Sequence, residues 1–358
     1  MLMIILGAGA SYDSAAAYRP ANPTGGGHAN FGTPALPPYD GGPWRPPLAK
    51  DLFLDRHHEI GLIVSRYPKL AHILPYLREP SDGRTVEQML ESFQEESSNN
   101  TETKRELASV RFYLCELFSK ITEEWSAQTN GVTNFAPLIR DALRFNTTNE
   151  EICLVTFNYD GLLERALYSF DFKGRTPQEH FDSHPTLKLF KLHGSVGWSR
   201  LVDLPGATRL SPQAIIDEVA RFRISEKFVL ANATNPQEAF RFEQPLFPAI
   251  AIPVQTKSDQ YFECPLAHRE YLAERLRYIS KILIIGWQAK EAHFLDMLRF
   301  NLPQLKGVMV VGRDAHDAEA TLKYFMGEIR LHVPNQYVGQ GGFTTFITTH
   351  EGDNFFKG

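Results

Sequence analysis

The chain has 358 residues, of which 43% are hydrophobic and 22% are charged. A chain of this length and composition buries a large core without disulfides or metal staples, which excludes intrinsic disorder and the collagen-like and disulfide-scaffold classes. The formal net charge of −5 at pH 7 offers no footprint for general nucleic-acid binding, which leaves only a local basic groove for such a role.

Short apolar runs end at a glycine or a turn, as strands covered on both faces of a parallel sheet do. They are Met1–Leu6, Ile152–Phe157, Lys281–Ile285 and Val308–Val311. A further run, Leu187–Leu192, alternates with lysines and is predicted to lie nearer an edge of the sheet. Helical patterns alternate with these runs at Leu162–Leu167, Leu266–Ile279 and Ala289–Leu298. The alternation predicts an α/β fold with a Rossmann-like parallel sheet.

Two segments interrupt this pattern. Residues 19–47 are rich in glycine and proline, which predicts a long loop, and we expect that loop to act as a lid or gate over a cofactor. Helical patterns then follow, with a capping box at Thr85–Gln88 and apolar spacing over Leu107–Ile121 that favours core packing over a partner-binding face. We therefore predict a catalytic core formed by residues 1–56 and 147–358, with an inserted helical subdomain at residues 57–146.

Three cysteines, Cys115, Cys153 and Cys264, stand far apart, and no CxxC pair occurs. The spacing encodes neither a zinc ribbon nor a redox dithiol, and an odd, sparse cysteine count fits a reducing compartment. No apolar run approaches the roughly 20 residues that a bilayer requires, and the apolar N-terminus lacks a basic leader. We expect a cytoplasmic protein without a membrane partner.

A glycine-rich turn follows the first predicted strand in Leu6–Ser11, which reads LGAGAS. Gly7 and Gly9 would let backbone N–H groups approach a pyrophosphate closely. The third glycine of the dinucleotide fingerprint and the acidic residue about 20 positions later are missing, so an ordinary dehydrogenase is not indicated. A purely structural turn explains these glycines equally well.

Polar residues follow the next two predicted strands. In VTFNYDGLLE, an N-cap role accounts for Asp160, whereas Asn158 is a polar residue at the carboxyl end of a core strand. In FKLHGSVGW, His193 ends the strand that precedes Gly194 and Ser195. A lone histidine at a strand end is most often structural, but ligands bind at this edge of open α/β sheets, and two such residues there favour a site.

Two further motifs, LIIGWQAKEAHF and VVGRD, also place a turn after a strand. Each is a common turn of α/β folds, and a structural explanation is favoured for each alone. Taken in order, however, GAGAS, TFNYDGLLE, KLHGS, IIGWQ and VVGRD resemble the sirtuin family, and in particular its bacterial sirtuin-like branch associated with NAD consumption in antiviral defence. The motifs span residues 7 to 314, which is most of the core.

The resemblance implies catalytic roles for three residues beside the nicotinamide ribose, namely Asn158, Asp160 and His193. It also implies three groups that bind the rest of NAD. The pyrophosphate would lie on Gly7, Ala8, Gly9 and Ser11. The adenosine ribose would lie beside Gly286, Trp287 and Gln288, and the adenine between Gly312 and Arg313.

The chain departs from the protein-deacylating members of that family. They carry a zinc ribbon with two cysteine pairs after the catalytic histidine, whereas only Cys264 follows His193 here. Hydrolysis of NAD itself needs neither zinc nor a peptide groove. The expected function is therefore that of an NAD⁺ glycohydrolase, with NAD as substrate and no metal, acting as an effector of bacterial antiphage defence by NAD depletion.

Four other functions stay open. An NAD-dependent protein deacylase or an ADP-ribosyltransferase would use the same residues with another nucleophile. A catalytically silent module that binds NAD or ADP-ribose is disfavoured by the presence of both Asn158 and His193, and a nucleic-acid effector by the acidic balance. Because an NADase that is always active would drain its own cell, we expect a homo-oligomer that is gated by a partner ATPase or sensor protein.

A last cluster, His180, Asp182 and His184, has the period-2 spacing of a strand and could in principle hold a metal. A polar loop is the favoured interpretation, because a structural metal site needs about four clustered ligands.

Overall fold

The computed structural model describes residues 1–16, 42, 44–54, 56, 58–174, 176–206, 209–254 and 262–357. The loop predicted over residues 19–47 therefore lies outside the described residues, apart from 42 and 44–47. No helix in the described ranges is both long enough and apolar enough to span a membrane.

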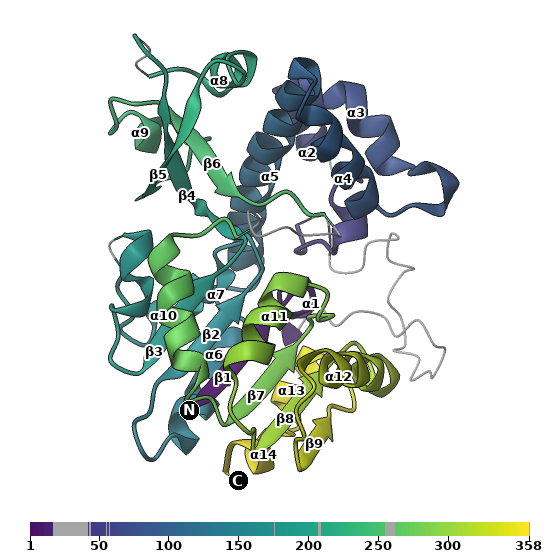
Figure 1. Cartoon of the computed structure of the whole chain (residues 1–358), viewed down its shortest axis with the longest axis vertical. Coiled ribbons are helices and arrows are strands. Elements are labelled where there is room, and N and C mark those ends of the chain that lie inside the picture. The colour runs from purple at the N-terminus through teal and green to yellow at the C-terminus, as the bar shows by residue number, and fades with distance from the viewer. Residues whose placement is uncertain are drawn as a thin grey trace.

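A six-stranded, all-parallel sheet forms the lower half of the molecule in Figure 1. From one edge to the other its strands are β3 (Leu187–Lys191), β2 (Ile152–Thr156), β1 (Leu2–Leu6), β7 (Lys281–Ile285), β8 (Gly307–Val311) and β9 (Asn335–Val338). The predicted α/β, Rossmann-like fold is confirmed, and so is the edge position predicted for the strand that carries the lysines. The polar edge strand β9 was not predicted.

Helices cover both faces of this sheet, which explains why its central strands are apolar on both sides. One face packs against α10 (Leu266–Leu276), α11 (Ala292–Asn301) and α12 (Ala315–Ile329). The other packs against α6 (Phe135–Phe145), α7 (Leu162–Tyr168), α13 (Phe343–Thr348) and α14 (Asp353–Lys357).

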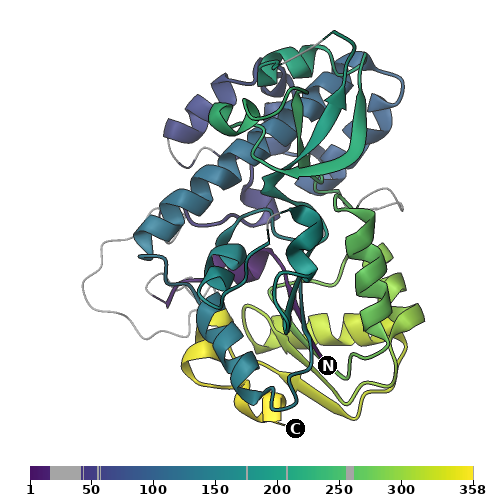
Figure 2. The same ribbon diagram turned by 90° about the vertical axis from the view of Figure 1, so that its left-hand side faces the viewer.

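The upper half combines helices with a small antiparallel sheet (Figures 1 and 2). The helices are α2 (His58–Ser65), α3 (Pro68–Arg78), α4 (Val86–Ser97) and α5 (Thr101–Gln128). The sheet has the order β5 (Arg223–Leu230), β4 (Gly194–Asp203), β6 (Leu246–Ile250), with α8 (Pro212–Asp217) and α9 (Pro236–Ala239) beside it. Short 3-10 helices complete the structure at η2 (Ala49–Asp51), η3 (Ser81–Gly83) and η4 (Pro177–Phe181).

The long helix α5 connects the two halves. Its apolar positions from Leu107 to Ile121 are buried in a cluster shared with the antiparallel sheet, which confirms the prediction of core packing, and Trp125 enters the cluster under the parallel sheet. The capping box at the start of α4 is also present, because the Thr85 side chain and the Gln88 side chain each bond the other residue's backbone N–H.

Some segments pack across the predicted domain boundaries. Helix α6, which lies inside the range predicted as the inserted subdomain, packs under the parallel sheet. Strands β4 to β6, which lie inside the range predicted as the catalytic core, pack against α5. The boundaries at residues 57 and 146 stay a prediction.

Candidate functional site

The parallel register aligns the carboxyl ends of five strands. Leu6 of β1 lies between Thr156 of β2 and Ile285 of β7, while β3 and β8 are in step with their neighbours. The five motifs singled out in the sequence follow these ends directly, so the fold brings them to one edge of the sheet. This is the edge at which open α/β sheets bind ligands.

The turn after β1 leads into the short helix α1 (Ala8–Tyr12) and packs tightly on the turn after β7. Gly7 N–H donates to the Ile285 carbonyl and Gly9 N–H donates to the Gly286 carbonyl, each at 3.0 Å. A Cβ atom on Gly7 would lie 2.5 Å from the Gly286 oxygen, and one on Gly286, which has a φ of +60°, would lie 2.3 Å from the Ala10 nitrogen. Close backbone approach therefore explains the glycines, and a pyrophosphate here would have to use donors of the turn other than these two amides.

Asn158 ties the end of β2 to this turn. Its side-chain Nδ2 donates to the Gly7 carbonyl at 2.9 Å and to the Ser11 hydroxyl at 2.8 Å. Its backbone N–H donates to Oγ1 of Thr156 at 3.1 Å, which fixes the start of the turn. The half-buried side chain keeps its amide oxygen unbonded among the residues that the structure describes, so that this oxygen can accept a hydrogen bond from a ligand hydroxyl or a water.

Asp160 extends the same hydrogen-bond chain. Its carboxylate accepts from the Leu162 N–H at 3.1 Å, at the start of α7, and lies near enough to the Ser11 hydroxyl for that group to lower its pKa. Burial raises the pKa of Asp160, while the nearby charge of Lys191 and the bond from Ser11 oppose that rise. The prediction that Asp160 is the N-cap is wrong by one residue, because Gly161 occupies that position of α7, although the Asp160 carboxylate still bonds the first N–H of the helix.

His193 lies after β3, against the aromatic residue that precedes Asn158. Its ring meets Phe157 edge to face with centroids 4.8 Å apart, and only 6% of the residue is exposed. Its backbone carbonyl accepts from the Ala251 N–H at 3.0 Å, which anchors the strand end to the segment after β6. Asn158 and His193 therefore lie at neighbouring strand ends, and Phe157, the residue before Asn158, contacts the His193 ring.

The residues predicted to border the adenosine differ in their surroundings. Trp287 is buried, stacks on Phe157 with centroids 5.3 Å apart, and donates its indole N–H to Glu291. Gln288 and Arg313 are exposed, and the Arg313 guanidinium bonds Asp314 at 3.1 Å. Trp287 thus serves first as a packing residue of this edge, while Gln288 and Arg313 face solvent.

A buried ion pair beside the site was missed by the sequence analysis. The Lys191 ammonium is fully buried and contacts the Glu164 carboxylate at 2.7 Å and the Asp160 backbone carbonyl at 2.5 Å. The Ser195 hydroxyl donates to the same Glu164 oxygen at 3.2 Å. All four residues lie inside the quoted motifs NYDGLLE and KLHGS, so their position was a usable signal.

The cluster of His180, Asp182 and His184 does not converge. His180 is buried against the Trp198 ring, with centroids 5.3 Å apart, whereas Nδ1 of His184 accepts from the Thr186 and Leu187 N–H groups. In the described ranges, the residues that could hold a metal ion are instead His72, Glu102 and Glu106, whose ligand atoms lie within 4.8 Å of one another.

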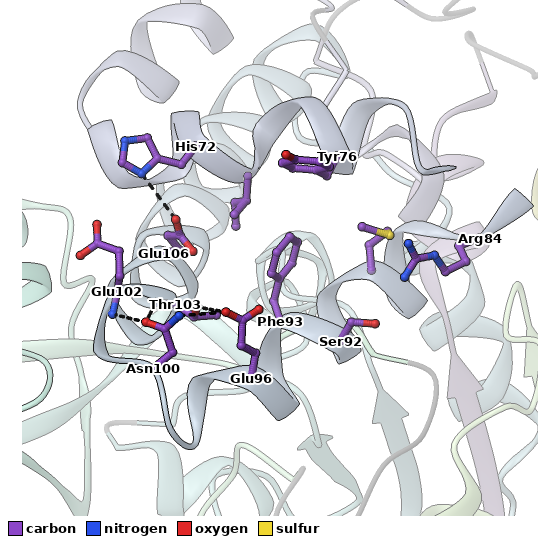
Figure 3. Close-up of a pocket in the computed structure, with 12 residues that line it drawn as sticks. His72, Tyr76, Arg84, Ser92, Phe93, Glu96, Asn100, Glu102, Thr103 and Glu106 are labelled. Carbon is purple, nitrogen blue, oxygen red and sulfur yellow. Dashed lines mark hydrogen bonds and ion pairs between the residues drawn. The ribbon is translucent and has the colours of Figure 1, made fainter. Parts of the chain in front are cut away.

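That triad lines a pocket of about 550 Å³ between α3, α4 and α5 (Figure 3). His72 Nδ1 faces the Glu106 carboxylate at 3.4 Å, and Glu102 already pairs with Lys69 at 2.5 Å and Arg105 at 3.2 Å. These two cations neutralise the negative charge of Glu102 that would otherwise attract a metal ion. The pocket includes none of the strand-end motif residues.

No protein-family model matches the chain, and no curated protein matches it at a significant level.

Proposed function

We propose that this chain is an NAD⁺ glycohydrolase that cleaves NAD⁺ to nicotinamide and ADP-ribose. The observation that carries the proposal is the hydrogen-bonded link from Asn158 to Gly7 and Ser11, with His193 at the neighbouring strand end against Phe157. It gathers an amide, a hydroxyl and an imidazole at the ligand-binding edge of a Rossmann-like sheet. The order of the motifs, which resembles the sirtuin-like NAD-consuming proteins, supports NAD as the substrate.

Cleavage of the bond between nicotinamide and ribose needs little acid catalysis. The bond between C1′ and the pyridinium nitrogen breaks, its electron pair goes to that nitrogen, and nicotinamide leaves as a neutral base. A water oxygen then bonds C1′, and its proton passes to a base and on to solvent. The protein must hold the ribose, stabilise the oxocarbenium-like charge and place the water.

The residues at the edge suit these tasks. The free amide oxygen of Asn158 is proposed to accept a hydrogen bond from a ribose hydroxyl or from the attacking water. His193 is proposed to act as the general base, the role that imidazole most often takes. Asp160, linked to Asn158 through Ser11, is proposed to stabilise the site electrostatically.

The biological setting follows the resemblance. We propose that the enzyme depletes NAD in bacterial antiphage defence, as a cytoplasmic homo-oligomer gated by a partner ATPase or sensor. Constant hydrolysis of NAD would kill the host, so the activity must be latent until the assembly forms.

Product analysis of the activated assembly tests the reaction class. NAD⁺ is supplied with and without an acetylated peptide, and nicotinamide and the ribose-containing product are measured. The proposal expects nicotinamide and free ADP-ribose at the same rate in both arms. Release that requires the peptide, with acetylated ADP-ribose as product, would make the protein a deacylase. ADP-ribose attached to protein would make it a transferase.

A further inference from the structure

Lys191 is a fully buried cation with two partners. Its ammonium donates to the Glu164 carboxylate at 2.7 Å and to the backbone carbonyl of Asp160 at 2.5 Å. Burying an ammonium is costly unless it is paired and hydrogen-bonded, so both contacts are needed to hold it. The contact with Glu164 balances the charge, while the contact with the Asp160 carbonyl holds the backbone of the turn that carries Asp160.

Glu164 is equally dependent on this lysine. One of its oxygens accepts from both Lys191 and Ser195, and its second oxygen is buried without a partner among the described residues. Ser195 stands two residues after His193 at the start of β4. The pair therefore fastens the β2–α7 turn to the strand end that presents His193.

The grip on Asp160 continues to the glycine turn. The Asp160 carboxylate lies near Ser11, which lowers its pKa, and the Ser11 hydroxyl accepts from Asn158, which in turn bonds the Gly7 carbonyl. A fixed backbone at Asp160 thus fixes where its carboxylate faces Ser11. A chain of neighbouring groups leads from Lys191 to the amide that we place beside the ribose.

We propose that Lys191 is a positioning residue that sets the Asp160–Ser11–Asn158 arrangement through its bond to the Asp160 carbonyl. The inference rests on the proposed function for its kinetic consequence. In the alternative role, Lys191 only neutralises the buried charge of Glu164. The two roles are distinguished by a variant that removes the Glu164 charge together with the lysine.

The test compares three variants of the full chain in its activated assembly. Lys191→Met leaves Glu164 buried and uncompensated, and it can fail to fold. Lys191→Met combined with Glu164→Gln removes both charges and loses the bond to Asp160. Lys188→Met is the matched control, because Lys188 lies on the same strand, is 6% exposed, and bonds the His184 carbonyl at 2.9 Å with Glu151 at 3.7 Å.

For the double variant we expect a folded protein whose kcat for NAD falls about 10- to 100-fold while KM changes little, since misplacement of about 1 Å costs on that order. Amide hydrogen exchange should also quicken in the segments around residues 7–13 and 157–164, while α12 keeps wild-type protection. The control should keep wild-type kcat and exchange in both segments.

A double variant with wild-type kcat would overturn the inference and leave Lys191 as a charge balance only. If wild-type protein turns over no NAD, the proposed function fails, and the exchange measurement then decides the inference. Unchanged protection of both segments in the double variant would overturn it.

Discussion

Asn158, at the end of β2, donates a hydrogen bond of 2.8 Å to the hydroxyl of Ser11 in α1, across two neighbouring strand ends. Because Nδ2 also donates to the Gly7 carbonyl, both N–H groups of the amide are bonded to protein atoms, and its oxygen is left to bond a ligand. The side chain is therefore oriented before any substrate arrives, and such preorganisation is the main way in which a protein stabilises developing charge.

Replacement of Asn158 by alanine should remove catalysis more than stability. We expect NAD turnover to fall by about 100-fold or more, since the water or ribose loses its partner. The two lost bonds should cost about 1 kcal/mol each in the free energy of unfolding. Asn146→Ala is the matched control, because Asn146 also makes two side-chain bonds, both to Glu150, and it precedes the amino end of β2, whereas the site follows the carboxyl end. Equal turnover in the two variants would remove Asn158 from the mechanism.

Two glycine substitutions should shift stability in opposite directions. Gly286→Ala places a Cβ 2.3 Å from the Ala10 nitrogen at a φ of +60°, and should lower the free energy of unfolding by about 1–3 kcal/mol. Gly327→Ala, inside α12, meets nothing within 4 Å and should raise it by about 0.5–1 kcal/mol. Urea denaturation measures both, and a neutral Gly286 variant would show that the two turns do not pack as described.

Stability should fall in mild acid because of two buried histidines. Burial lowers the pKa of His180 to about 4 and that of His268 to about 3. Below pH 6.5 these histidines therefore bind protons in the unfolded chain but not in the folded chain, which stabilises the unfolded state relative to the folded one. Above pH 6.5 the two histidines are neutral in both states and do not lower the free energy of unfolding. As the pH falls from 6.5 towards 4 that free energy decreases, and the decrease is about 2 kcal/mol per histidine at pH 5.

His180→Phe isolates this effect, since the ring is surrounded by Phe172 and Trp198. Denaturation at pH 7 and pH 5 should show a smaller acid loss for the variant than for wild type. An equal loss in both proteins would mean that His180 is protonated in the folded state.

Chelation should leave the fold intact. The three cysteines are free and buried apart from one another, and burial raises the pKa of each thiol to about 12, so none is poised to ligate a metal. We expect an unchanged melting temperature in a strong chelator and no stoichiometric zinc by elemental analysis. One metal per chain that disappears in His72→Ala would contradict this and would assign the ion to the pocket between α3 and α5.

The parallel sheet could be predicted from the sequence because its strands are apolar on both faces. Strand β9 could not, since it is mostly exposed and only Val338 and the Tyr337 ring contact the core. The antiparallel strand β4 was missed for a related reason, because its buried positions depend on α5 far away in the chain.

The strand-end residues could be predicted as a group, because a parallel sheet brings all its carboxyl ends to one edge. Lys191 and Glu164 lie inside two of the five motifs, which pointed to the residues, but their pairing in a buried ion pair could not be predicted. The two residues are 27 positions apart, and a lysine that alternates with apolar residues indicates an exposed edge until its partner is known. The same dependence on tertiary contacts applies to Gly7 and Gly286, because each needs to be glycine to fit against the backbone of the facing turn.

Release of nicotinamide from NAD⁺ by the activated assembly, with His193→Ala beside wild type, tests the central claim most directly. His332→Ala, an exposed histidine outside the five motifs, is the control for the loss of an imidazole. The account predicts peptide-independent release by wild type and by the control, and a decrease of about 10²–10⁴-fold in a well-folded His193 variant. Release by that variant at the wild-type rate, or none by the wild-type assembly, would contradict it.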